Sequence, residues 1–193
     1  MRFTPKQRVA IKTWTSQAVP LKGMYFRSVE YRYMDPGDVL SGAGAKAYGG
    51  RFAAIGTRAV YLSATDSGAG KEVTARKERL GGAPQITVSK YPRIVYAVAV
   101  DLERTLDLSC LASSEAAETV KVACLVKDDL SSSMELARKL EREGIQGLVF
   151  PSVVPGGDDN LVVYIANCAA NALTIQNEQE IIEQAKRIAT KHK

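Results

Sequence analysis

The sequence predicts a single-domain α+β fold, and three observations support this prediction. The chain has 193 residues, a length that suits one domain with its own hydrophobic core. Its residues are 46% hydrophobic and 24% charged, as in an ordinary soluble globular protein. Segments with strand character follow one another without a regular helix between each pair, so we do not expect a parallel sheet built from crossover helices.

Local patterns predict the individual elements. The spacing of apolar residues, together with possible caps, predicts helices over residues 4–16, 66–79, 132–143 and from about Asn177 onward. β-Branched and aromatic runs predict strands over residues 24–29, 58–63, 93–101, 145–150 and 160–167. The clearest of these is RIVYAVAVD, at residues 93–101.

Two helices have further signals. Ser132 and Glu135 have the spacing of a capping box at the start of the third helix. The last helix is amphipathic, with these residues on one face: Ile181, Ile182, Ala185, Ile188 and Ala189.

The glycine-rich segment 30–50 is expected to lack regular structure. Within it, Gly42, Gly44 and Ala47 fit a G-x-G-x-x-A dinucleotide fingerprint. That fingerprint needs a buried strand before it and a helix after it, whereas here MDPGD precedes it and several glycines interrupt the helix that should follow. We therefore reject a Rossmann interpretation.

Composition excludes several kinds of chemistry. The only histidine, His192, is next to last, which argues against a Ser/His/Asp triad, a histidine zinc site and an RNase-type acid–base pair. The net charge of +5 favours an anionic partner. Cys110, Cys124 and Cys168 are odd in number and widely spaced, so we expect buried thiols in a reducing compartment. We also find no signal-peptide core and no run long enough to span a membrane, and we expect a cytoplasmic protein.

The stretch YGGRF, residues 48–52, is the first that suggests a ligand site. Glycines allow a backbone to approach a ligand closely, and the guanidinium fork of Arg51 can hold a phosphate at two points. A hairpin turn followed by a surface arginine is the simpler interpretation of these five residues alone. Other residues make a site more attractive, namely Arg27 in the first strand, Tyr61 in the next and Glu72 in the helix after it.

This pattern resembles the RES domain family. The family has an arginine in its opening strand, a loop of small residues, GGR followed by an aromatic residue, a tyrosine ten residues later and a glutamate eleven further on, which here are Arg27, Arg51, Tyr61 and Glu72. Phe52 stands where the family usually has tryptophan.

A second block, GLVFPSVVPGGDDNLVVY, resembles a later part of the family pattern and contains Ser152 and Asn160. The resemblance implies an N-terminal extension over residues 1–23, a RES domain over 24–176 and a C-terminal helix over 177–193. It also implies a fold similar to that of ADP-ribosyltransferases, with a cleft for NAD⁺ between strands.

The resemblance further implies the toxin of a bacterial toxin–antitoxin pair that consumes NAD⁺ as its substrate and uses no metal. Its partner would be a helix-turn-helix, Xre-like antitoxin that blocks the active site, and contact with nucleic acid would occur only through that antitoxin. The implied catalytic residues are Glu72, Arg51 and Tyr61. The implied NAD⁺-binding residues are Arg27, Arg51, Tyr61, Ser152 and Asn160.

The residue types suit this chemistry. Cleavage of the nicotinamide–ribose bond releases a neutral ring, so the leaving group needs no general acid. The protein must instead hold the diphosphate, orient the pyridinium and stabilise an oxocarbenium-like ribose. Arginines suit the first task, an aromatic ring the second and a carboxylate the third.

Each residue also has a simpler structural explanation. Arg27 would be an edge-strand arginine facing solvent, Tyr61 a core residue and Glu72 a partner of the helix dipole. Ser152 and Asn160 would be turn residues. These alternatives stay open at the level of sequence.

Several functions also stay open. NAD⁺ cleavage with water or phosphate as acceptor is the first, and transfer of ADP-ribose to a protein, such as a nucleotide-biosynthesis enzyme, uses the same pocket. A toxin directed at RNA or DNA is less favoured because the positive residues are scattered among acids, as in ARKLEREG. A non-catalytic binding module is the fourth.

Overall fold

The fold is known from a computed structural model, which describes residues 3–70, 93–111, 114–126, 129–152 and 157–183. The helices are α1 (Pro5–Thr15), α2 (Pro36–Val39), α3 (Ala43–Tyr48), α5 (Glu115–Leu125) and α6 (Ser131–Arg142). The strands are β1 (Val19–Glu30), β2 (Ala59–Ser63), β3 (Arg93–Asp107), β4 (Gly147–Phe150), β5 (Asn160–Tyr164) and β6 (Leu173–Ile175). Residues 66–70 and 178–183 are also helical.

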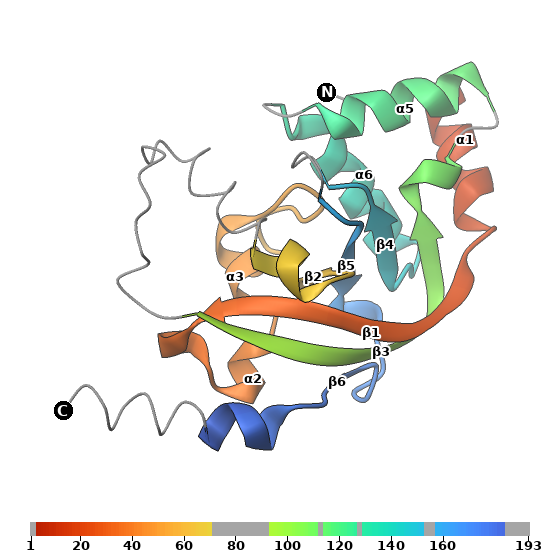
Figure 1. Cartoon of the computed structure of the whole chain (residues 1–193). Coiled ribbons are helices and arrows are strands. Elements are labelled where there is room, and N and C mark those ends of the chain that lie inside the picture. The colour runs from red at the N-terminus through yellow and green to blue at the C-terminus, as the bar shows by residue number, and fades with distance from the viewer. Residues whose placement is uncertain (1–2, 71–92, 112–113, 127–128, 153–156, 184–193) are drawn as a thin grey trace.

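One mixed sheet organises these elements (Figure 1). Strand β1 pairs with both β2 and β3, so β1, β2, β5, β4 and β3 close into a ring, while β6 adds to β3. The β3–β4 pair is parallel and the other pairs are antiparallel. The α+β prediction is therefore confirmed.

The sheet is dominated by a long ribbon of β1 and β3, which crosses the front of Figure 1. Its pairing runs from Val19 opposite Thr105 to Glu30 opposite Arg93. The sequence predicted both strands but made them too short, at 24–29 and 93–101. Much of β1 before residue 25 is exposed, so its backbone pairing is not accompanied by the apolar pattern from which a strand is recognised.

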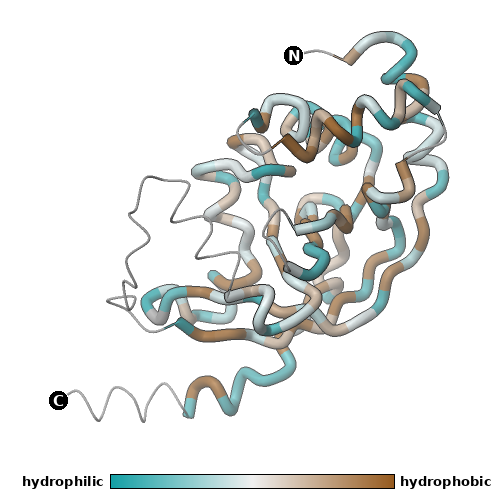
Figure 2. The backbone as a smooth tube through the Cα atoms, turned by 45° about the horizontal axis from the view of Figure 1, so that its top comes forward, coloured by the Kyte–Doolittle hydropathy of each residue, from teal (hydrophilic) through white to brown (hydrophobic). Residues whose placement is uncertain are grey.

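Apolar residues pack on both faces of the sheet. Successive residues of β5 point to opposite faces of the sheet and so belong to different hydrophobic clusters. Leu161 and Val163 belong to one cluster, and Val162 and Tyr164 belong to the other. The cluster with Val162 is covered by α1, α5 and α6, which lie together in the upper part of Figure 1. Figure 2 shows hydrophobic and hydrophilic residues interspersed along these helices, as expected where one side of a helix is buried.

Two helices show how the sequence sets local structure. Helix α1 begins with a capping box between Thr4 and Gln7 and buries Ile11 and Trp14, in agreement with the helix predicted over residues 4–16. Helix α5 and strand β6 were not predicted.

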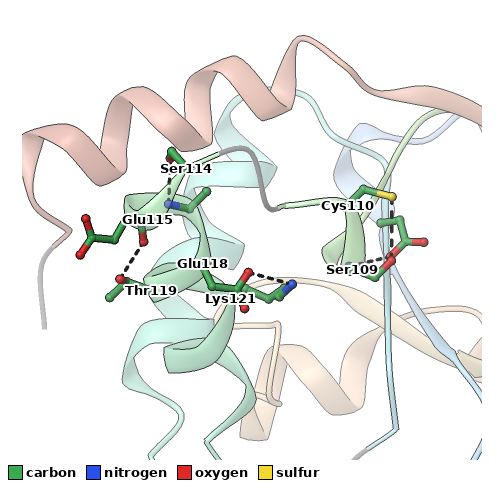
Figure 3. A network of polar contacts seen from close by, with 9 residues as sticks. Ser109, Cys110, Ser114, Glu115, Glu118, Thr119 and Lys121 are labelled. Carbon is green, nitrogen blue, oxygen red and sulfur yellow. Dashed lines mark hydrogen bonds and ion pairs between the residues drawn. The ribbon is translucent and has the colours of Figure 1, made fainter.

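Polar contacts define the first turns of α5 (Figure 3). The Ser114 hydroxyl accepts a hydrogen bond from the backbone N–H of Ala117 at 3.2 Å, and Lys121 pairs with Glu118. Ser114 is therefore the N-cap of a helix whose apolar residues had not been recognised as periodic.

The prediction that residues 30–50 lack regular structure is wrong, because α2 and α3 lie there. Two of the glycines stand at helix ends rather than inside a loop. Gly42 and Gly49, both with φ of +69°, flank α3 on its two sides. The rejection of the Rossmann fingerprint is confirmed, since α2 rather than a buried strand precedes Gly42.

The predicted capping box of α6 is also wrong. Ser132 is buried inside the helix, the N-cap position is Leu130, and the Asp129 carboxylate accepts from the backbone N–H of Ser131. An acidic side chain just before the helix thus does what Ser132 was expected to do.

The C-terminal part of the chain departs from the predictions in smaller ways. Strand β5 ends at Tyr164, and a short 3₁₀ turn replaces the rest of the expected strand 160–167. The last helix begins after Asn177 as expected, and Asn177 Oδ1 accepts from the backbone N–H of Ala97 on β3. Ile181 is buried and Ile182 half-buried, while the other residues of the predicted apolar face lie outside the described residues.

The three thiols differ in exposure. All are free cysteines, and Cys124 is buried while Cys168 is half-buried. Cys110 is exposed, so the expectation of a buried thiol is wrong there. In the described part of the chain, no three His, Cys, Asp or Glu residues are grouped so that they could hold a metal ion. No described helix combines the length and apolar character needed to cross a membrane.

Candidate functional site

The YGGRF stretch forms a tight turn that rests on Tyr61. The backbones of Gly50 and Ala53 exchange two hydrogen bonds, of 2.8 and 3.3 Å, which places Arg51 and Phe52 at the tip. The N–H of Phe52 then donates to the Tyr61 hydroxyl at 3.0 Å. The tyrosine therefore holds the turn in place through its phenol oxygen.

Gly50 is needed for this contact. A Cβ added at residue 50 would lie 2.5 Å from Tyr61 Oη and 2.8 Å from Cζ. Any side chain at this position would push the phenol away from the turn. Gly50 is therefore required for the close approach of the Tyr61 phenol to the turn. The other glycine, Gly49, provides the positive φ that ends α3.

Arg51 is a buried residue, only 9% exposed, which excludes the simpler interpretation of a surface arginine. Its Nη1 donates to the backbone carbonyls of Cys124 and Val126, at 3.2 and 2.9 Å. These carbonyls stand at the C-terminal end of α5, where the helix dipole favours a cation. Burial raises the pKa of the nearby Cys124 thiol to about 12, and the Arg51 charge opposes that shift.

An aromatic cluster joins the two blocks that the sequence had separated. The rings of Phe52 and Phe150 have centroids 4.6 Å apart, and Phe150 meets Tyr61 edge-on at 6.4 Å. Ser152 follows two residues after Phe150 and is partly exposed. The sequence did not lead us to predict Phe150 as a site residue, although it stands two residues before the candidate Ser152 in the second block of the family pattern.

Arg27 reaches the same tyrosine from β1. Its Nη1 donates to the backbone carbonyl of Tyr61 at 2.9 Å, and the residue is half-buried. Strands β1 and β2 are in register only at Phe26 and Ser63, so the arginine side chain crosses between them beyond that pair. Arg27 is therefore not a strand arginine that simply faces solvent.

Asn160 lies inside the sheet rather than at an exposed turn. It is 5% exposed and opens β5, where it stands in register between Ser63 on β2 and Phe150 on β4. The backbone N–H of Ala64 also donates to the carbonyl of Asp159 at 2.9 Å. This bond ties the segment before β5 to the end of β2.

Comparison with known proteins identifies the family. The chain belongs to the RES domain family. The family model matches residues 16–183, beginning directly after α1. A chain in the crystal structure of the M. tuberculosis MbcT–MbcA toxin–antitoxin complex has a similar fold, with a TM-score of 0.70, 21% sequence identity and 90% coverage of each chain. No curated protein matches the sequence.

Within this RES domain, contacts bring three of the predicted residues together. Tyr61 connects to Arg27 through its carbonyl and to the Arg51 turn through its hydroxyl. Asn160 pairs across the sheet with Ser63, which lies two residues after Tyr61 on β2. Ser152 lies two residues after Phe150, whose ring contacts Tyr61.

Glu72 lies outside the described residues, and the described helical residues that precede it in the sequence are 66–70. The Thr65 hydroxyl accepts from the N–H of Gly68 at 3.0 Å and donates to the Asp158 carboxylate. This pair of bonds attaches the start of the helix to the segment before Asn160.

The candidate site of this RES domain combines two cations with an aromatic cluster, in which Phe52 and Phe150 are buried and Tyr61 is partly exposed. Two guanidinium groups suit an anion such as a diphosphate, and the Tyr61 ring suits a planar cation. Tyr164, behind the site, is fully buried, and burial raises its pKa well above the usual value. It therefore keeps its proton and supplies no base.

Proposed function

We propose that this RES domain protein is the toxin of a bacterial toxin–antitoxin pair and that it cleaves the nicotinamide–ribose bond of NAD⁺. Family membership and the similar fold of a protein solved as part of a toxin–antitoxin complex support the first part. One observation carries the second. Tyr61 links Arg27, whose guanidinium donates to the Tyr61 carbonyl, to the turn that contains Arg51, whose Phe52 N–H donates to the Tyr61 hydroxyl.

We propose the following binding roles. The NAD⁺ cleft lies where β1 and β2 separate beyond the Phe26–Ser63 pair. Arg27 and Arg51 compensate the charge of the diphosphate, and the Tyr61 ring packs against the pyridinium, which its quadrupole attracts. Ser152 and Asn160 supply uncharged hydrogen-bonding groups.

The proposed reaction has one bond-breaking step. The bond between ribose C1′ and the pyridinium nitrogen breaks, and its electron pair goes to the ring, which leaves as neutral nicotinamide. The Glu72 carboxylate stabilises the positive charge that develops on the ribose. Water then adds to C1′ and releases one proton to solvent, giving ADP-ribose, or phosphate adds in its place.

The decisive experiment is mass spectrometry of NAD⁺ incubated with the purified protein, with and without phosphate. We expect nicotinamide together with ADP-ribose or its phosphate adduct. Glu72→Gln should slow the reaction by about 10²–10³-fold, as for other groups that stabilise transition-state charge. Glu103→Gln, which neutralises an exposed carboxylate on β3, is the matched control and should act like wild type.

Other outcomes would select other functions. Label from NAD⁺ that reaches one protein band only in cell lysate would favour ADP-ribosyl transfer. Salt-sensitive retention on nucleic acid without NAD⁺ turnover would favour a nucleic-acid-directed toxin. A Glu72→Gln protein as active as wild type would remove the basis for a catalytic carboxylate.

We infer that the partner is a small helix-turn-helix antitoxin that covers this site, and that the toxin acts in the cytoplasm, where NAD⁺ is available. The solved complex of the similar M. tuberculosis protein supports a proteinaceous partner. Co-expression with the product of a neighbouring gene should yield a stable complex in which NAD⁺ cleavage is suppressed. A complex that cleaves NAD⁺ as fast as the free protein would contradict this inference.

A further inference from the structure

Ser63, the last residue of β2, has a buried hydroxyl without a hydrogen-bond partner in the part of the chain that the structure describes. The residue is 2% exposed, and its Oγ is buried as well. Buried polar groups almost always have partners, because leaving one unsatisfied costs about 1–3 kcal/mol. The position of this hydroxyl in the fold therefore requires an explanation.

The strand register places Ser63 among the candidate site residues. It stands opposite Asn160 on β5 and opposite Phe26 on β1, the neighbour of Arg27. Residues paired across antiparallel strands share a face, and so do residues two apart on one strand. Ser63 therefore shares its face of the sheet with Asn160 and with Tyr61.

The helix after β2 closes over this hydroxyl. A Cβ added at Gly68 would lie 2.4 Å from Ser63 Oγ, so the helix comes this close only because residue 68 has no side chain. The same helix is anchored through Thr65 to Asp158, just before Asn160. Ser63 thus lies between the sheet and the helical residues 66–70.

We propose that Ser63 is a further substrate-binding residue, whose hydroxyl makes a hydrogen bond to the nicotinamide riboside half of NAD⁺. This proposal rests on the proposed NAD⁺-cleaving function. A hydroxyl both donates and accepts, and it suits an uncharged polar group such as a ribose hydroxyl or the carboxamide. Because the Ser63 hydroxyl is buried beneath the helix start at Gly68, the substrate reaches it when that helix start moves aside, and the bound substrate then supplies the partner that the described residues do not.

The chain offers a matched control for this proposal. Thr105 Oγ1 is also buried and also without a hydrogen-bond partner among the described residues, and the residue is 3% exposed. Thr105 pairs with Val19 on β1 and with Gly147 on β4. Arg27 pairs instead with Tyr96, toward the other end of the β1–β3 ribbon. An unsatisfied hydroxyl is therefore not sufficient to indicate a site, and the neighbours of Ser63 make the difference.

The test compares Ser63→Ala and Thr105→Val in the full-length protein. Each substitution removes an unsatisfied buried hydroxyl, so each variant should unfold at a temperature equal to or about 2–4 °C above that of wild type. Only Ser63→Ala should weaken the binding of the substrate, and it should raise KM for NAD⁺ about tenfold. The inhibition constant of ADP, which lacks the nicotinamide riboside half, should stay unchanged in both variants.

Three outcomes would overturn the role of Ser63. They are a wild-type KM in Ser63→Ala, a lowered kcat with unchanged KM, and a lowered unfolding temperature, which would show that the hydroxyl is already bonded in the free protein. If wild-type protein cleaves NAD⁺ and Ser63→Ala is unaltered, only this inference falls. If wild-type protein does not cleave NAD⁺, the proposed function falls and the Ser63 inference with it.

Discussion

Gly50→Ala tests the central contact of the site. The added Cβ would meet Tyr61 at 2.5 Å from Oη, 2.8 Å from Cζ and 3.0 Å from Cε2. The phenol has little freedom to move aside, since Phe150 packs against its ring and the N–H of Phe52 donates to its oxygen. The substitution should therefore displace the ring and break that hydrogen bond.

The magnitude follows from three terms. Overpacking of this kind costs about 1–3 kcal/mol, and loss of the hydrogen bond about 1 kcal/mol more. The residue at position 50 has no positive φ, so alanine regains about 0.4–1 kcal/mol by restricting the unfolded chain. The net loss of about 1–3.5 kcal/mol should lower the unfolding temperature by about 2–14 °C, at about 2–4 °C per kcal/mol for a protein of this size.

The assay combines thermal unfolding with NAD⁺ kinetics. Gly44→Ala is the control, because a Cβ there meets nothing within 4 Å and residue 44 lies inside α3. It should stabilise the protein by about 0.5–1 kcal/mol. A Gly50→Ala protein as stable as wild type and with unchanged KM for NAD⁺ would refute the reasoning.

Four further predictions concern the surroundings of the site and the cysteines. Arg51→Met removes the two hydrogen bonds to the end of α5, and it should lower the free energy of unfolding in urea by about 1.5–3 kcal/mol. Amide hydrogen exchange in the last turn of α5 should become faster, and unchanged exchange there would contradict the contact. Phe150→Leu removes two ring contacts and should cost about 1–3 kcal/mol while raising KM for NAD⁺, whereas an effect on stability alone would separate Phe150 from the site. Because burial raises the pKa of Cys124 from 9.0 to about 12, its contribution to stability is present below pH 9 and is lost as the pH rises toward 12, and Cys124→Ala should flatten that decline. A thiol reagent at pH 8 should modify exposed Cys110 and leave Cys124 unmodified until the protein unfolds; equal rates would contradict the burial.

Sequence patterns predicted the parts of this protein that depend on short-range order. The β-branched run of β3, the capped amphipathic α1 and strands that mostly follow one another without a crossover helix were sufficient for the α+β class, although α5 and α6 do connect the parallel pair β3–β4. The spacing of Arg27, Arg51, Tyr61 and Glu72 was sufficient for the RES family. Both are local features, set by the periods of helices and strands and by distances along the chain.

Tertiary structure decided what those residues contact. No local signal pairs Arg51 with the carbonyls of Cys124 and Val126, more than seventy residues away, or shows that Gly50 makes room for a phenol. The pairing of Ser63 and Phe150 with Asn160 likewise follows from strand register. Such contacts depend on how whole elements pack, and packing is settled by the combined burial of many side chains rather than by any one segment.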